Sequence, residues 1–418
     1  MRRLFQMKRA VKCISLILAL ASAVILALCA YLGRILPDSI TLYESGDTAF
    51  KEYSLFDINT VNVNISPKEQ QAAYIFENSA SVSDVSGQIT LFHIIPIKTV
   101  TVEKEQRRIV VPCGSLFGVK LHTKGAAVIK CCNILDERLG KMRNPAAECG
   151  LRPGDTICAV NGSEIKSYRD AERLTEESSG EALTLSCMRG DKAFTAEITP
   201  ALSENKYRLG LWIRDSAAGL GTMTFYEPDS GRFASLGHGI CDEETGGLLP
   251  IDKAEITAVE IAGITKGTDG SAGSINGYFS DLPPIGLADK NSGNGLFGEL
   301  VRPIEGIDPV AVAAAHEITK GRAQILCTID KGKAELYDIE ITAIDYDERN
   351  KTKNLEIMVC DERLKDKTGG IIQGMSGSPI LQNGKLAGAV THVLITNSVK
   401  GYGIFAQNMF DELDKRSI

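Results

Sequence analysis

The half of the chain that follows residue 206 consists of short stretches of alternating apolar and polar residues, separated by frequent turn signals. The turn signals all contain glycine and lie at residues 229–231, 246–247, 331–333 and 383–384. Only residues 309–318 and 406–415 have helical patterns. Many short strands with few helices are typical of β-barrels and β-sandwiches. Residues 207–418 therefore predict a mainly β domain, large enough for a pair of barrels.

An apolar segment near the N-terminus predicts a membrane-spanning helix. Residues 13–33 carry no charge, and a run of this length spans a bilayer. Five basic residues and no acidic residue precede it, which places everything after Gly33 outside the cytoplasm. We predict an uncleaved anchor within residues 1–36. A cleaved signal peptide is the alternative, although the sequence around Cys29 is a poor exit site.

Composition excludes several classes of protein. The net charge is −7 and no basic block is present, so nucleic acid is not an expected partner. Of eleven cysteines, two lie inside the apolar segment, and the remaining nine contain no C-x-x-C pair, which argues against a full disulfide framework. No spacing of cysteine and histidine fits a metal site. We expect neither a metal nor a cofactor.

Residues 37–200 have the pattern of two β-rich units. Residues 37–106 alternate between apolar and polar positions, with a break at Pro96, and predict a small β-rich region. Residues 107–200 begin with a strand over 109–112 and contain the tight turn Asn161-Gly162. A helix over residues 167–177 follows, with Ser167 as its cap and Asp170 as the capping-box partner.

The second unit resembles a PDZ domain. The resemblance rests on the motif A-x-x-x-G-L-R-P-G-D-x-I at residues 146–157 and on V-N-G at residues 160–162. It implies a domain over residues 107–200 that binds peptide C-termini or internal segments by adding a strand to an open sheet edge. By position, the terminal carboxylate would lie on the loop of Ser115, Leu116, Phe117 and Gly118. The alternative is a PDZ fold that serves only as a rigid spacer.

A glycine-rich loop at residues 369–379 carries the strongest chemical signal. Serine is a poor nucleophile unless a base takes its proton and donors hold the oxyanion that forms. Ser376 has a glycine two residues before it and another after it, so the N–H groups of Gly374 and Ser376 can form an oxyanion hole. Ser378 has Ser376 two residues before it, and we assign it to loop structure. A nucleophile on a tight loop that enters a hairpin is typical of chymotrypsin-like proteases.

Five histidines are candidates for the base. His93 and His122 lie before or inside the PDZ-like region, and His316 lies in a helix-like stretch. His392 lies on the strand after Ser376. His238 stands between two glycines, which leaves its ring uncrowded, and it gives the chain order His…Asp…Ser of chymotrypsin. We predict His238.

The third member of such a triad orients the imidazole and stabilises its protonated form. Asp361 follows an apolar strand over residues 355–359 and precedes Ser376 by fifteen residues. Asp361 is our prediction. The alternatives are Asp345, Asp347, Asp242 and, more weakly, Asp338.

The complete pattern resembles the stage IV sporulation protein B peptidase family of endospore-forming bacteria. The motifs are G-H-G-I at residues 237–240, T-G-G-I-I-Q-G-M-S-G-S-P-I at residues 368–380 and G-A-V-T-H-V at residues 388–393. The resemblance covers essentially the whole chain. It implies a chymotrypsin-like double β-barrel over residues 207–418, with His238, Asp361 and Ser376 as the catalytic residues.

The resemblance also implies a course of events. Such a serine endopeptidase is exported across the forespore membrane and cleaves itself near its N-terminus. It is then anchored or released in the space between the forespore and mother-cell membranes. There it cleaves the regulatory subunit of an intramembrane metalloprotease complex, which leads to activation of a late sigma factor. The PDZ domain is implied in restraint of the enzyme and in target recognition.

Two further details bear on mechanism. Met375 occupies the position at which trypsin-like zymogens carry an aspartate that pairs with a new N-terminus, so that route of activation is excluded. His392 is a hypothetical pocket-wall residue, with a core histidine as the alternative. The competing functions are a non-catalytic PDZ scaffold with a vestigial protease-like domain and a membrane-tethered structural protein.

Overall fold

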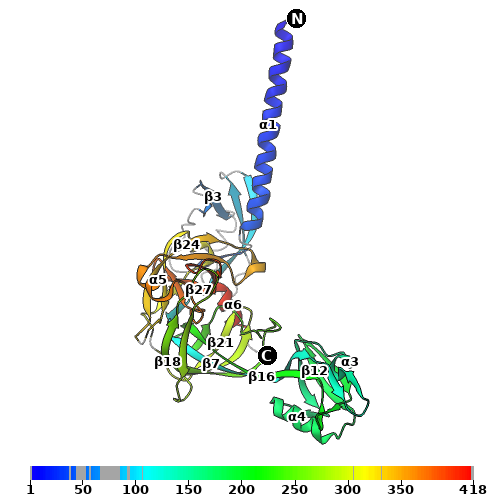
Figure 1. Ribbon diagram of the computed structural model, residues 1–418. Helices are drawn as coiled ribbons and strands as arrows, with labels where there is room; N and C mark the ends of the chain where they lie inside the picture. The colour runs from blue at the N-terminus through cyan, green and yellow to red at the C-terminus, as the bar shows by residue number, and fades with distance from the viewer. Residues whose placement is uncertain are drawn as a thin grey trace.

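The computed structural model describes residues 2–36, 39–43, 53–55, 58–65, 85–91, 95–105, 107–304, 306–330 and 332–415. Figure 1 shows a long N-terminal helix, a small sheet at its base, a large β domain and a smaller domain on the flank of the large one. The fold is mainly β, as the sequence predicts.

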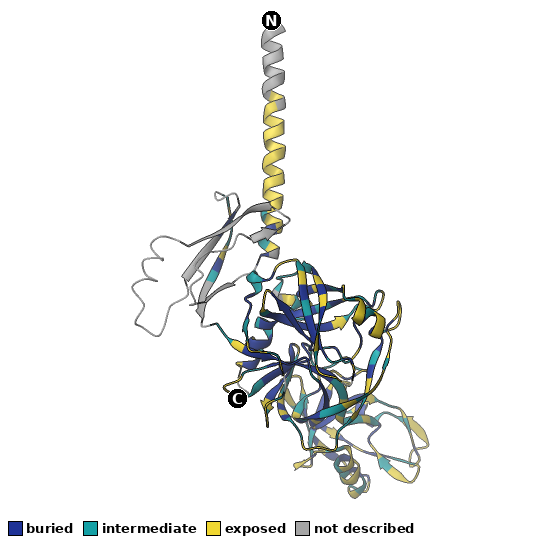
Figure 2. Ribbon diagram, turned by 90° about the vertical axis from the view of Figure 1, so that its left-hand side faces the viewer, coloured by how far each residue is buried: buried dark blue, intermediate teal, exposed yellow. Residues whose placement is uncertain are grey.

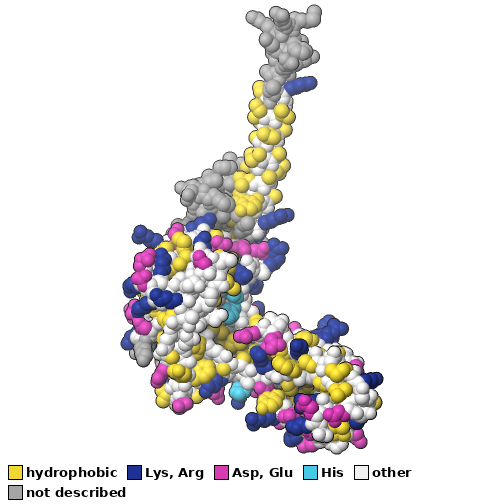
Figure 3. Space-filling view, in the orientation of Figure 1, with side chains coloured by type: hydrophobic (Ala, Val, Ile, Leu, Met, Phe, Trp, Pro, Cys, Tyr) yellow, Lys and Arg dark blue, Asp and Glu magenta, His cyan; other side chains and the backbone are white. Residues whose placement is uncertain are grey.

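The N-terminal helix α1, Arg2–Ile35, has an apolar segment whose described side chains are mostly exposed. Its segment Ile14–Arg34 has a mean hydropathy of 2.5, and side chains such as Leu16 and Leu26 are about 70% exposed. Figures 2 and 3 show this exposed apolar surface in yellow along the helix. So much exposed apolar surface is stable in lipid rather than in water. The helix has the length and composition of a membrane anchor or a signal sequence.

The next part of the chain forms a five-stranded sheet in the order β1-β5-β4-β3-β2. Strand β4 ends at Leu91, and Pro96 is the second residue of β5. The Lys98 ammonium donates to the carbonyl oxygen of Leu36, which attaches the sheet to the end of α1. The strands are β1 (Ser39–Tyr43), β2 (Tyr53–Leu55), β3 (Ile58–Ile65), β4 (Val85–Leu91) and β5 (Ile95–Glu105).

The large domain contains two six-stranded barrels, each closed by antiparallel pairing. The first closes in the order β7-β16-β17-β21-β20-β18, around a core that includes Phe117 and Phe233. Its strands are β7 (Leu116–Cys131), β16 (Leu211–Tyr226), β17 (Arg232–Ser235), β18 (Ile251–Thr265), β20 (Gly286–Ser292) and β21 (Gly295–Leu300). Strand β19 (Ser274–Phe279) extends β18 as a hairpin.

The second barrel closes in the order β23-β24-β25-β28-β27-β26, around a core that includes Ile341 and Ile357. Strand β6 (Ile109–Pro112) joins the barrels because it pairs with β16 of the first and, through β22 (Val310–Val312), with β27 of the second. The other strands are β23 (Gly321–Cys327), β24 (Glu335–Ile344), β25 (Leu355–Val359), β26 (Pro379–Gln382), β27 (Lys385–Val393) and β28 (Lys400–Phe405).

The smaller domain is inserted between β7 and β16. These two strands continue out of the first barrel, and β10 pairs with β7 at Ala126 and Ala127. Figure 1 shows β16 running from the large domain into the small one. The inserted elements are β8 (Ile134–Asp136), β9 (Lys141–Arg143), α3 (Pro145–Glu148), β10 (Asp155–Val160), β11 (Ser163–Glu164), α4 (Tyr168–Glu177), β12 (Leu183–Arg189), β13 (Lys192–Ile198), β14 (Ala201–Ser203) and β15 (Lys206–Arg208).

The local predictions for this domain agree with the structure. Asn161 and Gly162 have φ values of 49° and 77°, the left-handed conformation that a tight hairpin turn of this kind needs. The Ser167 hydroxyl accepts from the Asp170 N–H, and the Asp170 carboxylate accepts from the Ser167 N–H, which completes the capping box of α4.

The predicted limits of the PDZ domain need correction. Residues 109–118 belong to the barrels, and the chain re-enters the first barrel along β16, so the two predicted ranges 107–200 and 207–418 are interleaved. The predicted carboxylate loop at Ser115, Leu116, Phe117 and Gly118 is also wrong. Gly118 pairs with Leu220 and Thr257 inside the first barrel, where the Phe117 ring is 1% exposed. An apolar strand next to a PDZ motif does not reveal which sheet it joins, because strand pairing depends on distant partners.

Of the two predicted helices in the large domain, one is wrong. Residues 309–318 form β22 and a single 3₁₀ turn, Ala315–Glu317, because Val310 and its neighbours pair with β6. Helix α6, Ala406–Leu413, matches the other prediction and packs Phe410 against Phe225. A further helix, α5 (Glu362–Thr368), precedes the glycine-rich loop.

Candidate active site

The glycine-rich loop runs from the end of α5 to the start of β26. Gly369 ends α5 in the left-handed conformation, with φ 75°. Gly374 and Gly377 also have positive φ, of 100° and 95°. A side chain at Gly377 would overlap the Thr222 carbonyl oxygen, 2.0 Å from the ideal Cβ position. Glycine is required there both for conformation and for space.

The peptide units around Ser376 are oriented by bonds on the outer side of the loop. The Gln373 carbonyl accepts from the Ile275 N–H at 2.9 Å, and the Met375 carbonyl accepts from the Ser378 N–H at 2.9 Å and from the Ser378 hydroxyl at 2.7 Å. In a trans peptide the N–H points opposite to the C=O. The N–H groups of Gly374 and Ser376 therefore point away from these partners.

Neither of those two N–H groups has an acceptor among the described residues. Gly374 and Ser376 are partly exposed, so these two N–H groups are open to water or to the oxygen of a ligand. Two such donors beside a serine hydroxyl are what an oxyanion hole requires. Ser378, which is fully buried, has the structural part that the sequence assigned to it.

The Ser376 hydroxyl is partly exposed and donates to the carbonyl oxygen of Thr391, on β27, at 2.9 Å. Thr391 itself is held from the other side, since its own hydroxyl donates to the Thr352 carbonyl at 2.8 Å. The next residue, His392, points its ring toward His238, with 5.1 Å between the ring centroids. Ser376 therefore lies on a loop bonded to the residue before His392, and His392 is in ring contact with His238.

His238 lies at the end of β17, on a segment that packs against the Ser376 loop. The ideal Cβ position at Gly377 is 2.5 Å from the Leu236 nitrogen, and that at Gly237 is 2.9 Å from Cγ2 of Thr391. Nδ1 of His238 lies 2.9 Å from the Gly239 carbonyl oxygen. Since a carbonyl only accepts, Nδ1 carries the proton and Nε2 keeps a lone pair for proton abstraction.

Burial lowers the pKa of His238 below its ordinary value, and the bond to the Gly239 carbonyl opposes this in part. The ring is therefore neutral at pH 7, which a general base must be. The pKa of His392 is lowered to about 4 by burial, by the neighbouring His238 and by Lys353. His392 keeps an exposed edge at the site.

Asp361 does not lie with His238. Its carboxylate caps α5 by accepting from the Arg363 N–H at 2.9 Å, pairs with the Arg363 guanidinium at 2.8 Å and accepts from the Asp338 N–H. Among the described residues, no hydrogen bond joins it to His238. The predicted triad is therefore not assembled around this aspartate.

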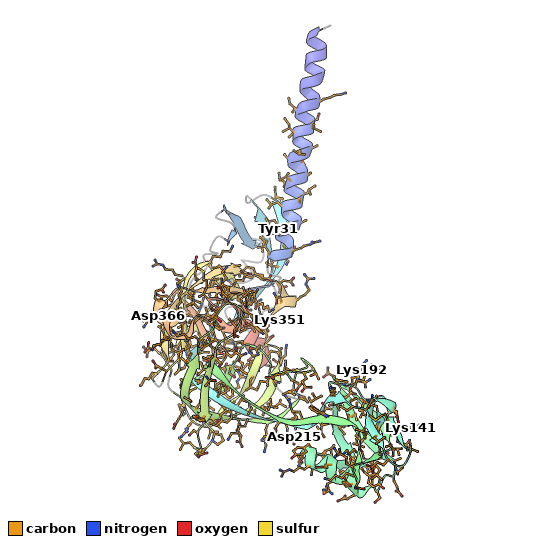
Figure 4. The ribbon with its side chains drawn as sticks, in the orientation of Figure 1. Tyr31, Lys141, Lys192, Asp215, Lys351 and Asp366 are labelled. Carbon is orange, nitrogen blue, oxygen red and sulfur yellow. The ribbon has the colours of Figure 1, made fainter. Side chains whose placement is uncertain are left out.

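The sheet register gives the reason. Tyr402 on β28 pairs with His392 on one side and with Glu356 of β25 on the other. Strand β25 then runs on to Val359, about 10 Å further at 3.3 Å per residue, and Asp361 follows. Figure 4 shows the same separation. Asp366 marks α5, the helix that Asp361 caps, and Lys351 is the neighbour of Thr352, whose carbonyl accepts from the Thr391 hydroxyl; the two labelled residues lie on opposite sides of the large domain.

The alternative aspartates have other partners as well. The Asp242 carboxylate pairs with Arg214, and that of Asp338 accepts from the Gln324 amide. The Asp345 carboxylate accepts from the Asp347 N–H, and that of Asp347 pairs with Arg349. No carboxylate contributes to the shifted pKa of His238. Within the described residues, the group that orients the imidazole is the main-chain carbonyl of Gly239, which no side-chain motif could reveal.

A second candidate site lies in the inserted domain. A groove of about 300 Å³ separates α4 from the start of β16, and it is also lined by β15 and by residues 209–210, which connect β15 to β16. Residues 211–213 of β16 pair only with β7 among the described strands, which leaves their other edge open to the groove. This edge, rather than residues 115–118, has the geometry for strand addition.

Among the described residues, neither a charged patch nor a cluster of metal-binding side chains indicates a third site. On the face in Figure 3, acidic and basic side chains intermix over both domains. Within the described residues, no group of three His, Cys, Asp or Glu side chains is placed to hold a metal ion.

Comparison with known proteins gives matches to two family models. Residues 205–410 match the family described as SpoIVB peptidase S55, and residues 143–189 match the PDZ domain family. These ranges correspond to most of the barrel pair and to the centre of the inserted domain.

Curated relatives match over short segments. A protein described as a zinc metalloprotease of Mesorhizobium japonicum is 32% identical over 77 residues, which are 18% of this chain and 21% of that protein. Another, from Neisseria meningitidis serogroup A, is 39% identical over 57 residues, 14% of this chain and 13% of that protein. The chain thus spans about a fifth or less of the length of these relatives.

Two solved structures are also similar. The PDZ domain of the SdrC-like protein of Listeria monocytogenes is 22% identical and covers 22% of this chain and 87% of its own, with a TM-score of 0.18. The active form of the Rv3671c protease of M. tuberculosis is 15% identical and covers 48% of this chain and 74% of its own, with a TM-score of 0.27.

Proposed function

We propose that the protein is a serine endopeptidase with Ser376 as nucleophile and His238 as general base, since residues 205–410 match the SpoIVB peptidase S55 family. The observation that carries the proposal is the pair of N–H groups at Gly374 and Ser376, which flank the nucleophile candidate and have no acceptor within the described part of the chain. A histidine with a free Nε2 lies on the segment packed against the same loop.

The chemistry follows from these groups. The Ser376 hydroxyl turns from the Thr391 carbonyl to Nε2 of His238, which takes the proton as the oxygen attacks the scissile carbonyl. The N–H groups of Gly374 and Ser376 stabilise the oxyanion. His238 then returns the proton to the leaving amine, and a water molecule repeats the sequence on the acyl-enzyme. The Gly239 carbonyl holds the Nδ1 proton and partly offsets the charge on the imidazolium.

The fluorophosphonate reaction tests this proposal directly. The full chain in detergent micelles is treated with a fluorophosphonate probe, and the labelled residue is identified by mass spectrometry. Labelling on Ser376 supports the peptidase. A chain that is folded but unlabelled supports the alternative, a non-catalytic PDZ scaffold. The observation that favours this alternative is that the Ser376 hydroxyl donates to the Thr391 carbonyl and not to His238.

The finer parts of the function rest on the family resemblance. We propose that the enzyme cleaves itself between α1 and the barrels, and then cleaves the regulatory subunit of an intramembrane metalloprotease complex during sporulation. Export across the forespore membrane, by way of α1, would place both reactions between the two membranes. Sequencing of the mature N-terminus in the wild type and in Ser376→Ala tests self-cleavage, which requires that only the wild type is shortened.

The groove of the inserted domain is the proposed docking site for a peptide end or an internal segment of the target. Its open edge on β16 supports this role. His392, which packs on His238 at the exposed side of the site, is the proposed wall of the substrate pocket.

A further inference from the structure

Thr222 lies on β16 where the strand passes beneath the Ser376 loop, and it is 1% exposed. Its hydroxyl donates to the Gly374 carbonyl at 2.7 Å, and its N–H donates to the Ser376 carbonyl at 2.9 Å. Its own carbonyl accepts from the Leu236 N–H at 3.4 Å. One residue is thus bonded to both segments that build the site.

The bonds from Thr222 to the Gly374 and Ser376 carbonyls complete a row of hydrogen bonds along the loop. Each of the four successive carbonyls of residues 373–376 has a donor on the outer side of the loop. Ile275 supplies one of these donors, Ser378 holds another carbonyl, and Thr222 holds the remaining two. With every carbonyl held outward, the N–H groups of Gly374 and Ser376 keep their direction without any substrate present.

The third bond concerns the base. Leu236 precedes His238 by two residues on the first barrel, whereas Gly374 and Ser376 belong to the second. A shift of β16 relative to either segment would change the position of the imidazole relative to the nucleophile. Losses in rate from small misplacements of this kind can be large.

We propose that Thr222 is a positioning residue for catalysis: its hydroxyl preorganises the oxyanion hole through the Gly374 carbonyl, and its backbone fixes the Ser376 loop against the His238 segment. This inference rests on the proposed peptidase function. Under this inference Thr222, a buried strand residue, contributes to stabilisation of the transition state. Hydrophobic packing alone would not require a hydroxyl at this position.

The substitution Thr222→Val tests the hydroxyl at nearly constant shape. It leaves the Gly374 carbonyl without its donor, so the 374–375 peptide unit, which lies between the two units that carry the donors of the hole, is held only by the bond from the Met375 N–H to the Ile372 carbonyl. Rotation of this central unit would loosen both of its neighbours. Loss of a whole oxyanion donor costs roughly 10²–10³ in kcat, so a loosened hole is expected to cost about tenfold to a hundredfold. KM changes less than about twofold, because the hole acts on the transition state. Thr222→Ser keeps the hydroxyl and restores kcat.

Thr224 provides the matched control. It lies two residues further along β16, is fully buried, and its hydroxyl has no hydrogen-bond partner among the described residues. Thr224→Val therefore makes the same chemical change on the same strand without removing a hydrogen bond to the loop. We expect its kcat and KM to equal those of the wild type.

The measurement is kcat and KM of the full chain in detergent on an internally quenched peptide, with inhibition by a peptide boronic acid as a second readout. The boronate adduct needs the oxyanion hole, so its inhibition constant should weaken in proportion to the loss of kcat. If Thr222→Val does not fold, Thr222→Ala replaces it with the same expectation.

Equal kcat in Thr222→Val and Thr224→Val, or no recovery in Thr222→Ser, would overturn the inference. Cleavage that persists in Ser376→Ala would overturn the peptidase proposal itself, whatever Thr222 shows. The two failures are thereby distinguished.

Discussion

The Ser376 hydroxyl donates to the carbonyl oxygen of Thr391, 2.9 Å away, and Thr391 precedes the histidine that packs on His238. Among the described residues, the Ser376 hydroxyl thus makes no hydrogen bond to His238, the base of the proposed peptidase. Catalytic hydrogen bonds are often loose before substrate binds and tighten in the complex. A substrate carbonyl that enters the oxyanion hole would draw the Ser376 oxygen inward and away from Thr391. The resting bond thus accounts for a site that is built but not yet engaged.

Substitutions of Ser376 and Ser378, the two serines of the loop, should have different effects on activity. Ser376→Ala should abolish fluorophosphonate labelling and peptide cleavage. Ser378→Ala should keep both, because the Ser378 N–H still holds the Met375 carbonyl. Loss of the buried Ser378 hydroxyl bond should lower the free energy of unfolding by about 1 kcal/mol. Labelling and thermal unfolding of the two variants check this, and labelling that survives in Ser376→Ala would refute the assignment.

Asp361 should tolerate asparagine. A triad aspartate replaced by asparagine loses roughly 10⁴ in turnover. The carboxylate of Asp361 instead caps α5, and asparagine caps helices equally well. We expect Asp361→Asn to keep kcat within about tenfold, well short of the loss for a triad member. Steady-state kinetics on a peptide substrate decide the matter, and a 10⁴-fold loss would restore Asp361 to the catalytic set.

Asp361→Ala has a different consequence. It removes the cap of the helix that leads into the Ser376 loop and should lower the free energy of unfolding by about 1 kcal/mol. Denaturant unfolding followed by circular dichroism measures this loss. An alanine variant as stable as the wild type would show that the cap contributes nothing.

The pH profile should reflect the buried imidazole. His238 acts as a base only when neutral, and burial lowers its pKa from 6.5. Activity is therefore full at neutral pH and is lost as the pH falls through a midpoint below 6.5. The profile of kcat/KM between pH 4.5 and 8 gives that midpoint.

His122 serves as the control, because it lies on β7 facing Ser216 and Lys253 across the ladder. His122→Gln should leave the profile unchanged. A midpoint at or above pH 6.5 in the wild type would mean that a nearby carboxylate supports the imidazolium after all.

The inserted domain should be removable only at its own junction. Excision of residues 132–210, with an Asn-Gly turn joining Cys131 to Leu211, keeps the paired strands β7 and β16 intact. Ser376 labelling should survive. Deletion of residues 109–200 removes β6 and all of β7, so the first barrel cannot close and labelling should be lost. Equal labelling of both proteins would contradict the interleaved topology.

Features encoded within a dozen residues were open to prediction from sequence. The turn at Asn161, the cap at Ser167 and the glycines around Ser376 each depend on local backbone geometry. The features that escaped prediction depend on distant partners. Gly118 pairs with Thr257, and Thr222 meets Gly374, across more than 130 residues in each case. Distance along the chain also misled the choice of Asp361, since the sheet register carries it away from the site.

The two strands that join the domains pair on both sides of the junction, from Leu211 opposite Cys131 to Arg214 opposite Ala127 and from Ser216 opposite His122 to Thr222 opposite Leu116, with a break in register between the two stretches. Such a ribbon bends less readily than a single-chain tether. If the proposed docking in the groove occurs, the bound polypeptide would start its path toward Ser376 from a nearly constant point. The peptide bond that is cleaved would then be determined by its distance along the substrate from the docked segment. Insertion of residues between the docked segment and the cleavage site would shift cleavage to a different bond.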